Sequence, residues 1–247
     1  FKQELSEEEI QNVRREFISR LIERLSDDKS EVSYEYSLNI FQIFNELTYK
    51  KAFYELLIEQ DVLDRLLAIL NKAESPESNS NAAIRILNVL ISHLRDYLSN
   101  STQQNNTQTF MDDNDEVVLE DDETKDSESR SIEDQVAKHH LVTFFKDHIV
   151  DHLVEQLDKA PQTTHLDFQY ADNQFVLGKK RLACVNLMES LVELDDPKTR
   201  AKIMETKFYE QLFDLFLEFR FNTFLQLHLD NIFHRILKDQ NTSNADK

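Results

Sequence analysis

The sequence predicts an all-α fold, and its composition is the first observation that does so. The chain of 247 residues contains one glycine and three prolines, whereas an average chain of that length holds about 17 and about 12. Hairpin turns between strands depend on glycine, Asn-Gly pairs and proline. A β-rich fold is therefore disfavoured, while the 40% of hydrophobic residues suffices for a helical core.

The second observation is a succession of amphipathic segments joined by short polar turns. Pairs of such segments recur about every 40 residues, with no exact sequence repeat and no sustained heptad register. This spacing is typical of degenerate armadillo- or HEAT-like repeats. We therefore expect a right-handed array of helical hairpins, an α-solenoid.

The first expected helix opens with Ser6 and Glu9 at the spacing of a capping box. Its apolar residues recur three or four positions apart, which predicts one buried face. That face comprises Ile10, Val13, Phe17, Leu21 and Leu25.

Further helices are expected up to residue 98. "YSLNIFQIFNEL" is apolar on more than one face, which predicts burial between neighbouring helices. "KKAFYELLIEQ" and "DVLDRLLAILNKA" follow as two helices, with Asp61 as the expected N-cap of the second. "SPESNSN" is expected to break the chain before the helix "NAAIRILNVLISHLRDYL".

Composition also divides the chain into regions. The segment after residue 98 is rich in polar and acidic residues and buries too little apolar surface to offset its ordering entropy. We favour a solvated charge run there; the alternative is a flexible arm that docks on a basic surface or is phosphorylated. We expect helical repeats over 1–98, a disordered acidic insertion over 99–130, repeats of the same domain over 131–240, and a tail over 241–247.

The C-terminal helices are expected to begin where Ser131 and Asp134 stand at capping-box spacing. Residues 158–177 are expected to form a loop. Gly178, the only glycine of the chain, then marks a helix start that needs a positive φ or a close approach of the backbone. Pro197 is placed in the first turn of a later helix, where its missing N–H costs nothing.

The net charge of the chain limits the classes of molecule that it is expected to bind. Its 28 basic and 47 acidic side chains give a net charge of −19, and such a surface repels phosphate backbones and anionic lipids. Nucleic acid and membrane are therefore disfavoured, and a protein with a basic or mixed face is expected as the partner. One cysteine, no signal-like start and no long apolar run indicate an intracellular protein, and a chain beginning with Phe1 is taken as a piece of a longer one.

A pair of histidines is the strongest candidate for a metal-binding site in the sequence. His148 and His152 lie four residues apart, the spacing of helical zinc ligands, with His139 or His140 further back. No cysteine accompanies them and no glutamate directly follows His148, so ordinary polar surface is the favoured interpretation. A metal-dependent hydrolase built on these histidines stays open as an alternative.

The remaining reactive side chains are given structural interpretations. Cys184 lies among apolar residues, which predicts a buried thiol rather than a nucleophile. Asp195 and Asp196 precede Pro197, so helix capping explains them. One glycine cannot build a phosphate-binding loop or a nucleophile elbow. We therefore expect no enzymatic activity and no cofactor.

Phenylalanines are frequent near the C-terminus. Their helical spacing predicts that most belong to the core and that one or two are exposed. The series is Phe208, Phe213, Phe216, Phe219, Phe221 and Phe224.

Two C-terminal elements resemble the SAPS-domain family, the regulatory subunits of protein phosphatase 6 and its fungal counterpart. The family's Leu-Gly-x-x-Arg-Leu element is matched by Leu177, Gly178, Arg181 and Leu182. Its aromatic run, followed by an aromatic residue, Asn and a Phe-Leu pair, is matched by Phe213, Phe216, Phe221, Asn222, Phe224 and Leu225. The segments "FNELTYKKAFYELLIEQDVLDRLLAIL" and "AAIRILNVLISHL" also look like earlier helices of that family.

This chain departs from the family pattern at a few positions. Phe221 stands where the family usually carries Trp, Thr223 where it has a second Asn, and Gln226 where it has His. The proline often found before Leu-Gly is missing. These changes keep apolar packing but alter the expected phosphatase contacts.

The resemblance implies a non-catalytic scaffold subunit that binds a protein phosphatase 6-like catalytic subunit, with further regulatory subunits, and directs it to substrates. Such a complex is expected in the cytoplasm and also in the nucleus. An armadillo-like adaptor for transport or the cytoskeleton, without a phosphatase, is the alternative. The expected partner contacts are Arg181, Asn222, Phe224, Gln226 and Asn231, and the expected structural positions are Leu177, Gly178, Leu182, Phe216 and Leu225.

Overall fold

The computed structural model describes residues 6–27, 33–72, 76–108, 140–159, 165–168 and 171–245. These residues form helices, their connections and one short β-hairpin, so the all-α prediction is confirmed apart from that hairpin. None of the described helices combines the length and the apolar character needed to cross a bilayer.

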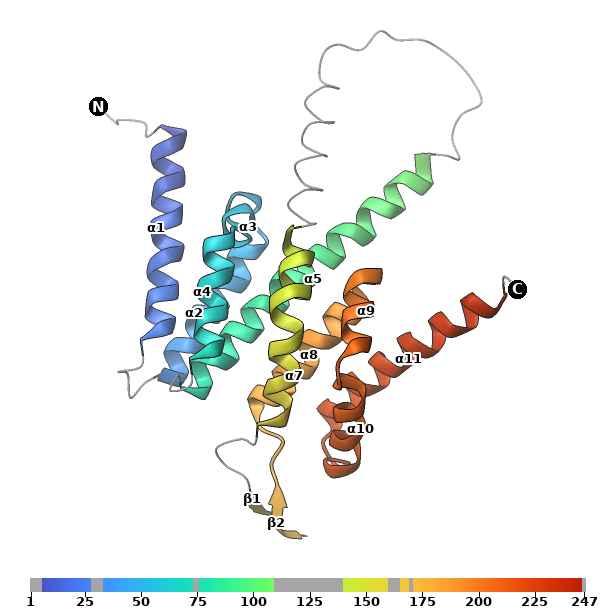
Figure 1. Cartoon of the computed structure of the whole chain (residues 1–247). Coiled ribbons are helices and arrows are strands. Elements are labelled where there is room, and N and C mark those ends of the chain that lie inside the picture. The colour runs from blue at the N-terminus through green and yellow to red at the C-terminus, as the bar shows by residue number, and fades with distance from the viewer. Residues whose placement is uncertain are drawn as a thin grey trace.

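The N-terminal helices lie side by side, and the last of them runs at an angle to the others (Figure 1). α1 contacts α2, α3 and α4, while α5 packs against both α2 and α4. The helices are α1 (Glu7–Ser26), α2 (Ser33–Thr48), α3 (Lys51–Leu57), α4 (Gln60–Asn71) and α5 (Glu77–Gln108).

The capping box predicted for α1 is confirmed. The Ser6 hydroxyl accepts a 3.3 Å hydrogen bond from the Glu9 main-chain N–H. The Glu9 carboxylate in turn accepts a 2.8 Å bond from the Ser6 N–H. This reciprocal pair holds the pKa of Glu9 below its ordinary value, because the hydrogen bonds from Ser6 favour the ionised carboxylate.

The predicted buried face of α1 is wrong in part. Val13 and Phe17 are exposed, and the buried stripe is Ile18, Ile22 and Leu25. Both stripes have helical spacing, so periodicity alone does not separate them. The choice is made by the neighbours, because α1 stands at one end of the helical body (Figure 1) and packs on one side only.

Two helix starts also differ from their predictions. Only Ile58 and Glu59 join α3 to α4, so α4 begins at Gln60 and Asp61 lies in its first turn instead of capping it. The expected break before α5 is helical from Glu77. The Ser37 hydroxyl donates a buried 2.6 Å hydrogen bond to the Asn79 side-chain oxygen, which fixes the polar first turn of α5 against α2.

The predicted boundary at residue 98 is wrong as well, because α5 continues to Gln108. No glycine or proline interrupts residues 99–108, and glutamine supports a helix. Most of the expected acidic insertion, together with Ser131 and Asp134, lies outside the described residues. At the other end, α11 runs to Ala245, past the expected start of the tail at 241.

The described C-terminal residues resume at His140. Residues 140–144 are helical and continue into a π-helical turn, η1. α9 begins as predicted: Pro197 occupies its first turn, and the Asp196 carboxylate accepts a 2.7 Å bond from the Thr199 N–H. The elements are η1 (Phe145–Ile149), α7 (Val150–Asp158), β1 (His165–Phe168), β2 (Ala171–Phe175), α8 (Lys179–Glu193), α9 (Pro197–Glu205), α10 (Phe208–Glu218) and α11 (Thr223–Ala245).

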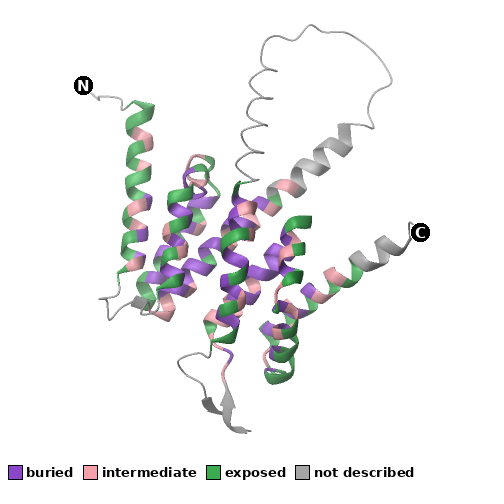
Figure 2. Ribbon diagram, in the orientation of Figure 1, coloured by how far each residue is buried: buried purple, intermediate pink, exposed green. Residues whose placement is uncertain are grey.

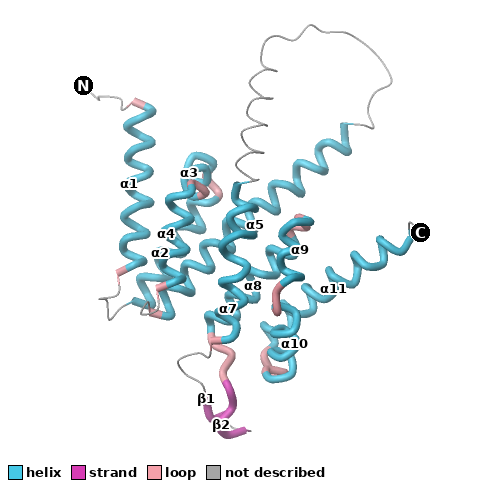
Figure 3. Tube along the Cα trace, viewed as in Figure 1, coloured by secondary structure: helices cyan, strands magenta, loops and turns pink. Residues whose placement is uncertain are grey.

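The segment expected as a loop over 158–177 contains the antiparallel pair β1–β2, which projects from the end of the helical body (Figure 3). His165 pairs with Phe175 and Leu166 with Gln174. Strand pairing satisfies main-chain N–H and C=O groups that a long connection would otherwise leave to water.

The core runs through the whole helical body (Figure 2). α5 packs against α2 on one side and α8 on the other, and α8 packs further against α7 and α11. The buried hydrophobic residues of these helices form one continuous cluster. α8 is therefore the element that joins the N-terminal helices to the C-terminal ones.

Candidate partner-binding surface

The start of α8 has the backbone that the lone glycine predicted. Gly178 has φ 83° and ψ 148° at the N-cap position, so the expectation of a positive φ is confirmed. A side chain on this residue would be strained, because this region is essentially restricted to glycine. Leu177, just before it, is buried in the core.

Arg181 ties the start of α8 to the end of α7. Its Nε donates a 2.8 Å hydrogen bond to the main-chain oxygen of Lys159. Leu182 is partly buried and packs against the core. The Leu-Gly-x-x-Arg-Leu element therefore closes the base of the connection that carries the hairpin, and the Arg181 guanidinium is engaged within the chain.

A polar cluster joins α8 to α11. Glu189 is only 7% exposed, and its carboxylate accepts a 2.6 Å hydrogen bond from the Asn231 side-chain amide and contacts Nδ1 of His228. Sequence reasoning placed Asn231 at a partner contact and did not single out Glu189 or His228. The available signal was a glutamate among apolar residues, "NLMESLVEL", which indicates a buried carboxylate that needs partners.

Asn222 has a role within the chain, whereas no side-chain hydrogen bond is found for Gln226 among the described residues. The Asn222 side-chain oxygen accepts a 3.1 Å bond from the Leu225 N–H at the start of α11, and Leu225 is fully buried. The Nε2 of Gln226 is buried without a hydrogen-bond partner among the described residues. Of the five expected contact residues, Phe224 and Asn231 are exposed, and Phe224 is the apolar one, at 70%.

The prediction that most C-terminal phenylalanines are buried is wrong. Phe208 and Phe219 belong to the core, while the others are exposed, with Phe221 reaching 77%. The rings of Phe213 and Phe216 stack at 6.4 Å between centroids. We name the exposed apolar side chains of α10, of the turn that follows it and of the start of α11 the aromatic face: Phe213, Phe216, Leu217, Phe221, Phe224 and Leu227.

The aromatic face arises because α10 and α11 lie at the C-terminal end of the helical body (Figure 1). Contacts with α7, α8 and α9 use one side of these helices and leave the other side in solvent. Exposed apolar patches of this kind mark interaction sites in soluble proteins. The arrangement suits binding of a protein and brings no nucleophile or acid–base pair together.

Comparison with known protein families decides the identity. The family model described as SAPS, SIT4 phosphatase-associated protein, matches residues 2–202. The chain belongs to the SAPS family. No curated protein and no solved structure matches the chain significantly.

SAPS proteins are non-catalytic regulatory subunits that associate with the catalytic subunit of SIT4/PP6-type phosphatases. The matched residues include the Gly178 element of this SAPS protein and end within α9. α10, α11 and the aromatic face therefore lie beyond the matched residues.

The histidines of this SAPS protein are arranged differently from a metal site. The π-helical turn of η1 changes the register between His148 and His152, so that His148 is exposed and packs on Phe144, while His152 is buried. Burial, with the nearby charge of Lys180, lowers the pKa of His152 to about 4. The described residues contain no cluster of three metal-ligating side chains.

Cys184 is fully buried in α8. Burial raises the pKa of its thiol to about 12, although the charge of Lys180 opposes this effect. A thiol held in its protonated form is a poor nucleophile. The predicted structural role of Cys184 therefore fits its surroundings.

Proposed function

We propose that this SAPS protein is an α-solenoid scaffold that binds the catalytic subunit of a SIT4/PP6-type phosphatase through its aromatic face and directs it to substrates. The solenoid assignment is supported by the succession of packed pairs α2–α5, α5–α8 and α8–α11. We further propose that the complex is found in the cytoplasm and also in the nucleus.

The aromatic face is the observation that carries this proposal. Interface hot spots are enriched in large side chains that reach desolvated pockets of the partner. Phe224 and Phe221 are the most exposed phenylalanines of this face. Arg181, Asn222 and Asn231 support the interface by holding helices in place, because their side chains bond within the chain.

The charge distribution favours a partner with cations around its apolar site. The described acids beside the aromatic face include Asp214, Glu218 and Asp230, which are all exposed. A cation, Arg220, also lies on this face, with its guanidinium carbon 5.4 Å from the centroid of the Phe221 ring. A rim of opposite charge on the phosphatase would speed association and fix orientation.

The test is a binding titration between the purified 247-residue chain and a SIT4/PP6-type catalytic subunit. Phe224→Ser and Phe221→Ser are expected to weaken binding by about 10- to 100-fold each, as for central interface aromatics. Tyr36→Ser is the control, since Tyr36 is also an exposed aromatic side chain, at 59%, and lies on α2 away from the aromatic face.

Equal loss of affinity in the Tyr36 variant would show a non-specific effect, and unchanged affinity in both Phe variants would move the contact elsewhere on the surface. If the unaltered chain does not bind the catalytic subunit at all, the proposed scaffold role is wrong and the adaptor alternative gains support. A form lacking residues 109–130 is expected to bind as the full chain does, because the aromatic face does not include them.

A further inference from the structure

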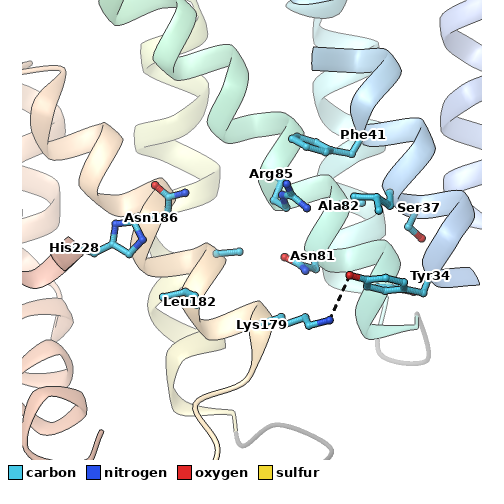
Figure 4. Close-up of a pocket in the computed structure, with 13 residues that line it drawn as sticks. Tyr34, Ser37, Phe41, Asn81, Ala82, Arg85, Lys179, Leu182, Asn186 and His228 are labelled. Atoms are coloured by element: carbon cyan, nitrogen blue, oxygen red, sulfur yellow. Dashed lines mark hydrogen bonds between the residues drawn. The ribbon is translucent and has the colours of Figure 1, made fainter. Parts of the chain in front are cut away.

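A second candidate site is a groove between α2, α5, α8 and α11 (Figure 4). It encloses about 250 Å³, slightly less than the roughly 300–1,000 Å³ of clefts that hold drug-sized ligands. This size suits one or two side chains of a partner rather than a cofactor. Its polar and aromatic lining includes Tyr34, Phe41, Asn81, Arg85, Lys179 and Asn186.

The lining follows helical spacing on three elements. Tyr34 and Phe41 lie two turns apart on α2, Asn81 and Arg85 lie one turn apart on α5, and Lys179 and Asn186 lie two turns apart on α8. The small residues Ala82 and Ala183 stand among them. Small side chains at these positions leave the space into which the longer polar ones extend.

Each of the two cations of the groove rests on an aromatic ring of α2. The Arg85 guanidinium carbon lies 3.9 Å from the centroid of the Phe41 ring. The Lys179 Nζ lies 4.5 Å from the centroid of Tyr34 and donates a 3.3 Å hydrogen bond to its hydroxyl. Rings in these positions hold the cations in place and leave their remaining N–H donors directed to solvent.

No aspartate or glutamate belongs to the groove lining, and no ion pair to Arg85 or Lys179 is found within the described ranges. The chain has a net charge of −19, and other arginines such as Arg15 pair with a carboxylate, Glu59 at 2.8 Å. The groove is therefore a local positive site on an acidic protein. Screening over about 8 Å at physiological salt lets this local charge act despite the distant acids.

One polar atom of the groove residues lacks a hydrogen-bond partner among the described residues. The side-chain oxygen of Asn81 is buried and has no hydrogen-bond partner among the described residues. A buried acceptor without a partner costs free energy unless a ligand or water supplies a donor. A main-chain N–H of a bound peptide is a suitable donor.

We propose that this groove binds an extended acidic segment of a partner protein, with two carboxylates on Arg85 and Lys179 and a main-chain N–H on Asn81. Nucleic acid is disfavoured as the source of negative charge, because its long phosphate backbone meets the net charge of −19. The proposal is independent of phosphatase binding through the aromatic face.

The spacing of the two aromatic residues on which the cations rest guides the choice of peptide pattern. Tyr34 and Phe41 are seven residues apart, or about 10.5 Å along α2 at about 1.5 Å per residue. In a polyproline II segment, positions i and i+3 lie on the same side about 9.3 Å apart. In a β-strand, positions i and i+2 share a side only about 6.6 Å apart. The expected ligand is therefore Glu-x-x-Glu in a proline-rich, extended context.

The experiment measures fluorescence anisotropy of labelled proline-rich peptides titrated with the full 247-residue chain. One peptide carries Glu at positions i and i+3, a second carries Gln at both, a third carries Glu at i and i+2, and a fourth carries phosphoserine at i and i+3. The first is expected to bind at least about tenfold more tightly than the second, which lacks both carboxylates, and than the third, whose carboxylates lie too close together to reach both cations.

Arg85→Gln and Lys179→Gln are each expected to weaken binding of the Glu-x-x-Glu peptide about tenfold. Arg14→Gln is the matched control, since Arg14 also lies over a phenylalanine, Phe53, at 5.8 Å but outside the groove. Thermal melting should be unchanged in the Arg85 and Lys179 variants, because both side chains are exposed.

Equal binding of the Glu and Gln peptides, or an equal loss in the Arg14 variant, would overturn the proposal. Binding of the phosphoserine peptide alone would overturn the assignment of the ligand as a carboxylate. Because the assay contains no phosphatase, its outcome is separate from the test of the aromatic face.

Discussion

The Nε of Arg181, in the first turn of α8, donates a 2.8 Å hydrogen bond to the main-chain oxygen of Lys159, directly after the end of α7. The bond spans the base of the connection that contains β1 and β2. A cation at the C-terminal end of a helix also interacts favourably with its unpaired carbonyls. One side chain thus joins the last turn of α7 to the first turn of α8.

The first prediction concerns this bond. Arg181→Ala is expected to lower the free energy of unfolding by about 1–2 kcal/mol, because a charged hydrogen bond and its packing are lost. Arg181→Lys should recover little, since an ammonium lacks the Nε geometry. Urea denaturation measures both variants. Unchanged stability together with weaker phosphatase binding would instead make Arg181 a contact residue.

The second prediction concerns Gly178. At φ 83° and ψ 148° the residue lies outside the left-handed helical region, so Asn offers no relief and only glycine avoids strain. Gly178→Val and Gly178→Asn are each expected to cost about 1–3 kcal/mol in urea denaturation. Ala201→Val, on the exposed surface of α9, is the control and should cost less than about 1 kcal/mol. A fully stable Gly178 variant would contradict the strain argument.

Local signals predicted the local structure well. The capping box of Ser6 and Glu9, Pro197 and Gly178 act through the backbone within one or two turns, so their patterns are visible in the sequence. The helices themselves follow from the spacing of apolar residues. The hairpin β1–β2 was not predicted because its turn carries neither glycine nor an Asn-Gly pair, which removes the usual hairpin signal.

Packing against neighbouring helices determines which helix faces are buried, and the sequence pattern alone does not. Two stripes on α1 have the same periodicity, and only its packing against α2, α3 and α4 selects the one with Ile18. The same reasoning applies to Phe221 and Phe224, which look like core residues until α10 and α11 are placed at the C-terminal end of the helical body (Figure 1). The groove was invisible in the sequence because Arg85 and Lys179 are 94 positions apart.

The third prediction separates structure from binding at Asn231. Its side-chain amide donates a 2.6 Å hydrogen bond to the buried carboxylate of Glu189. Asn231→Ala is therefore expected to lower the free energy of unfolding by about 1–3 kcal/mol. Affinity for the phosphatase should stay within about twofold at temperatures where the variant is folded, since the amide faces α8. Glu189→Gln with Asn231→Ala should cost less than the sum of the single variants in a double-mutant cycle. If the losses of stability in the two single variants add up fully in the double variant, Glu189 and Asn231 are not coupled.

The fourth prediction uses the reactivity of the Cys184 thiol to measure local unfolding of α8. Burial raises its pKa to about 12, whereas an unfolded thiol has a pKa of about 8.5. At pH 8 we expect Ellman's reagent to modify the native chain at least about a thousandfold more slowly than the urea-unfolded chain. The chain has one cysteine, so the released thiolate reports this position alone. Rapid reaction of the native chain would show that α8 opens locally.

The last prediction concerns pH and His152, which is 8% exposed. Burial lowers its folded pKa to about 4, with a further contribution from Lys180, while the unfolded imidazole has a pKa of about 6.5. Between these values the unfolded chain binds more protons, so stability is complete above pH 6.5 and falls as the pH drops toward 4. Allowing for solvent screening, we expect this group to remove about 1 kcal/mol between pH 7 and pH 5.

Comparison with His152→Gln isolates this effect from that of the carboxylates, which titrate in both proteins. Urea denaturation at pH 7 and pH 5 gives the change in unfolding free energy of each, and the unaltered chain should lose about 1 kcal/mol more than the variant. His148→Gln is the matched control, because His148 is exposed one turn away and should leave the difference unchanged. Identical pH dependence of the unaltered chain and His152→Gln would contradict the prediction. It would show that the imidazole binds a proton as readily in the folded protein as in the unfolded chain.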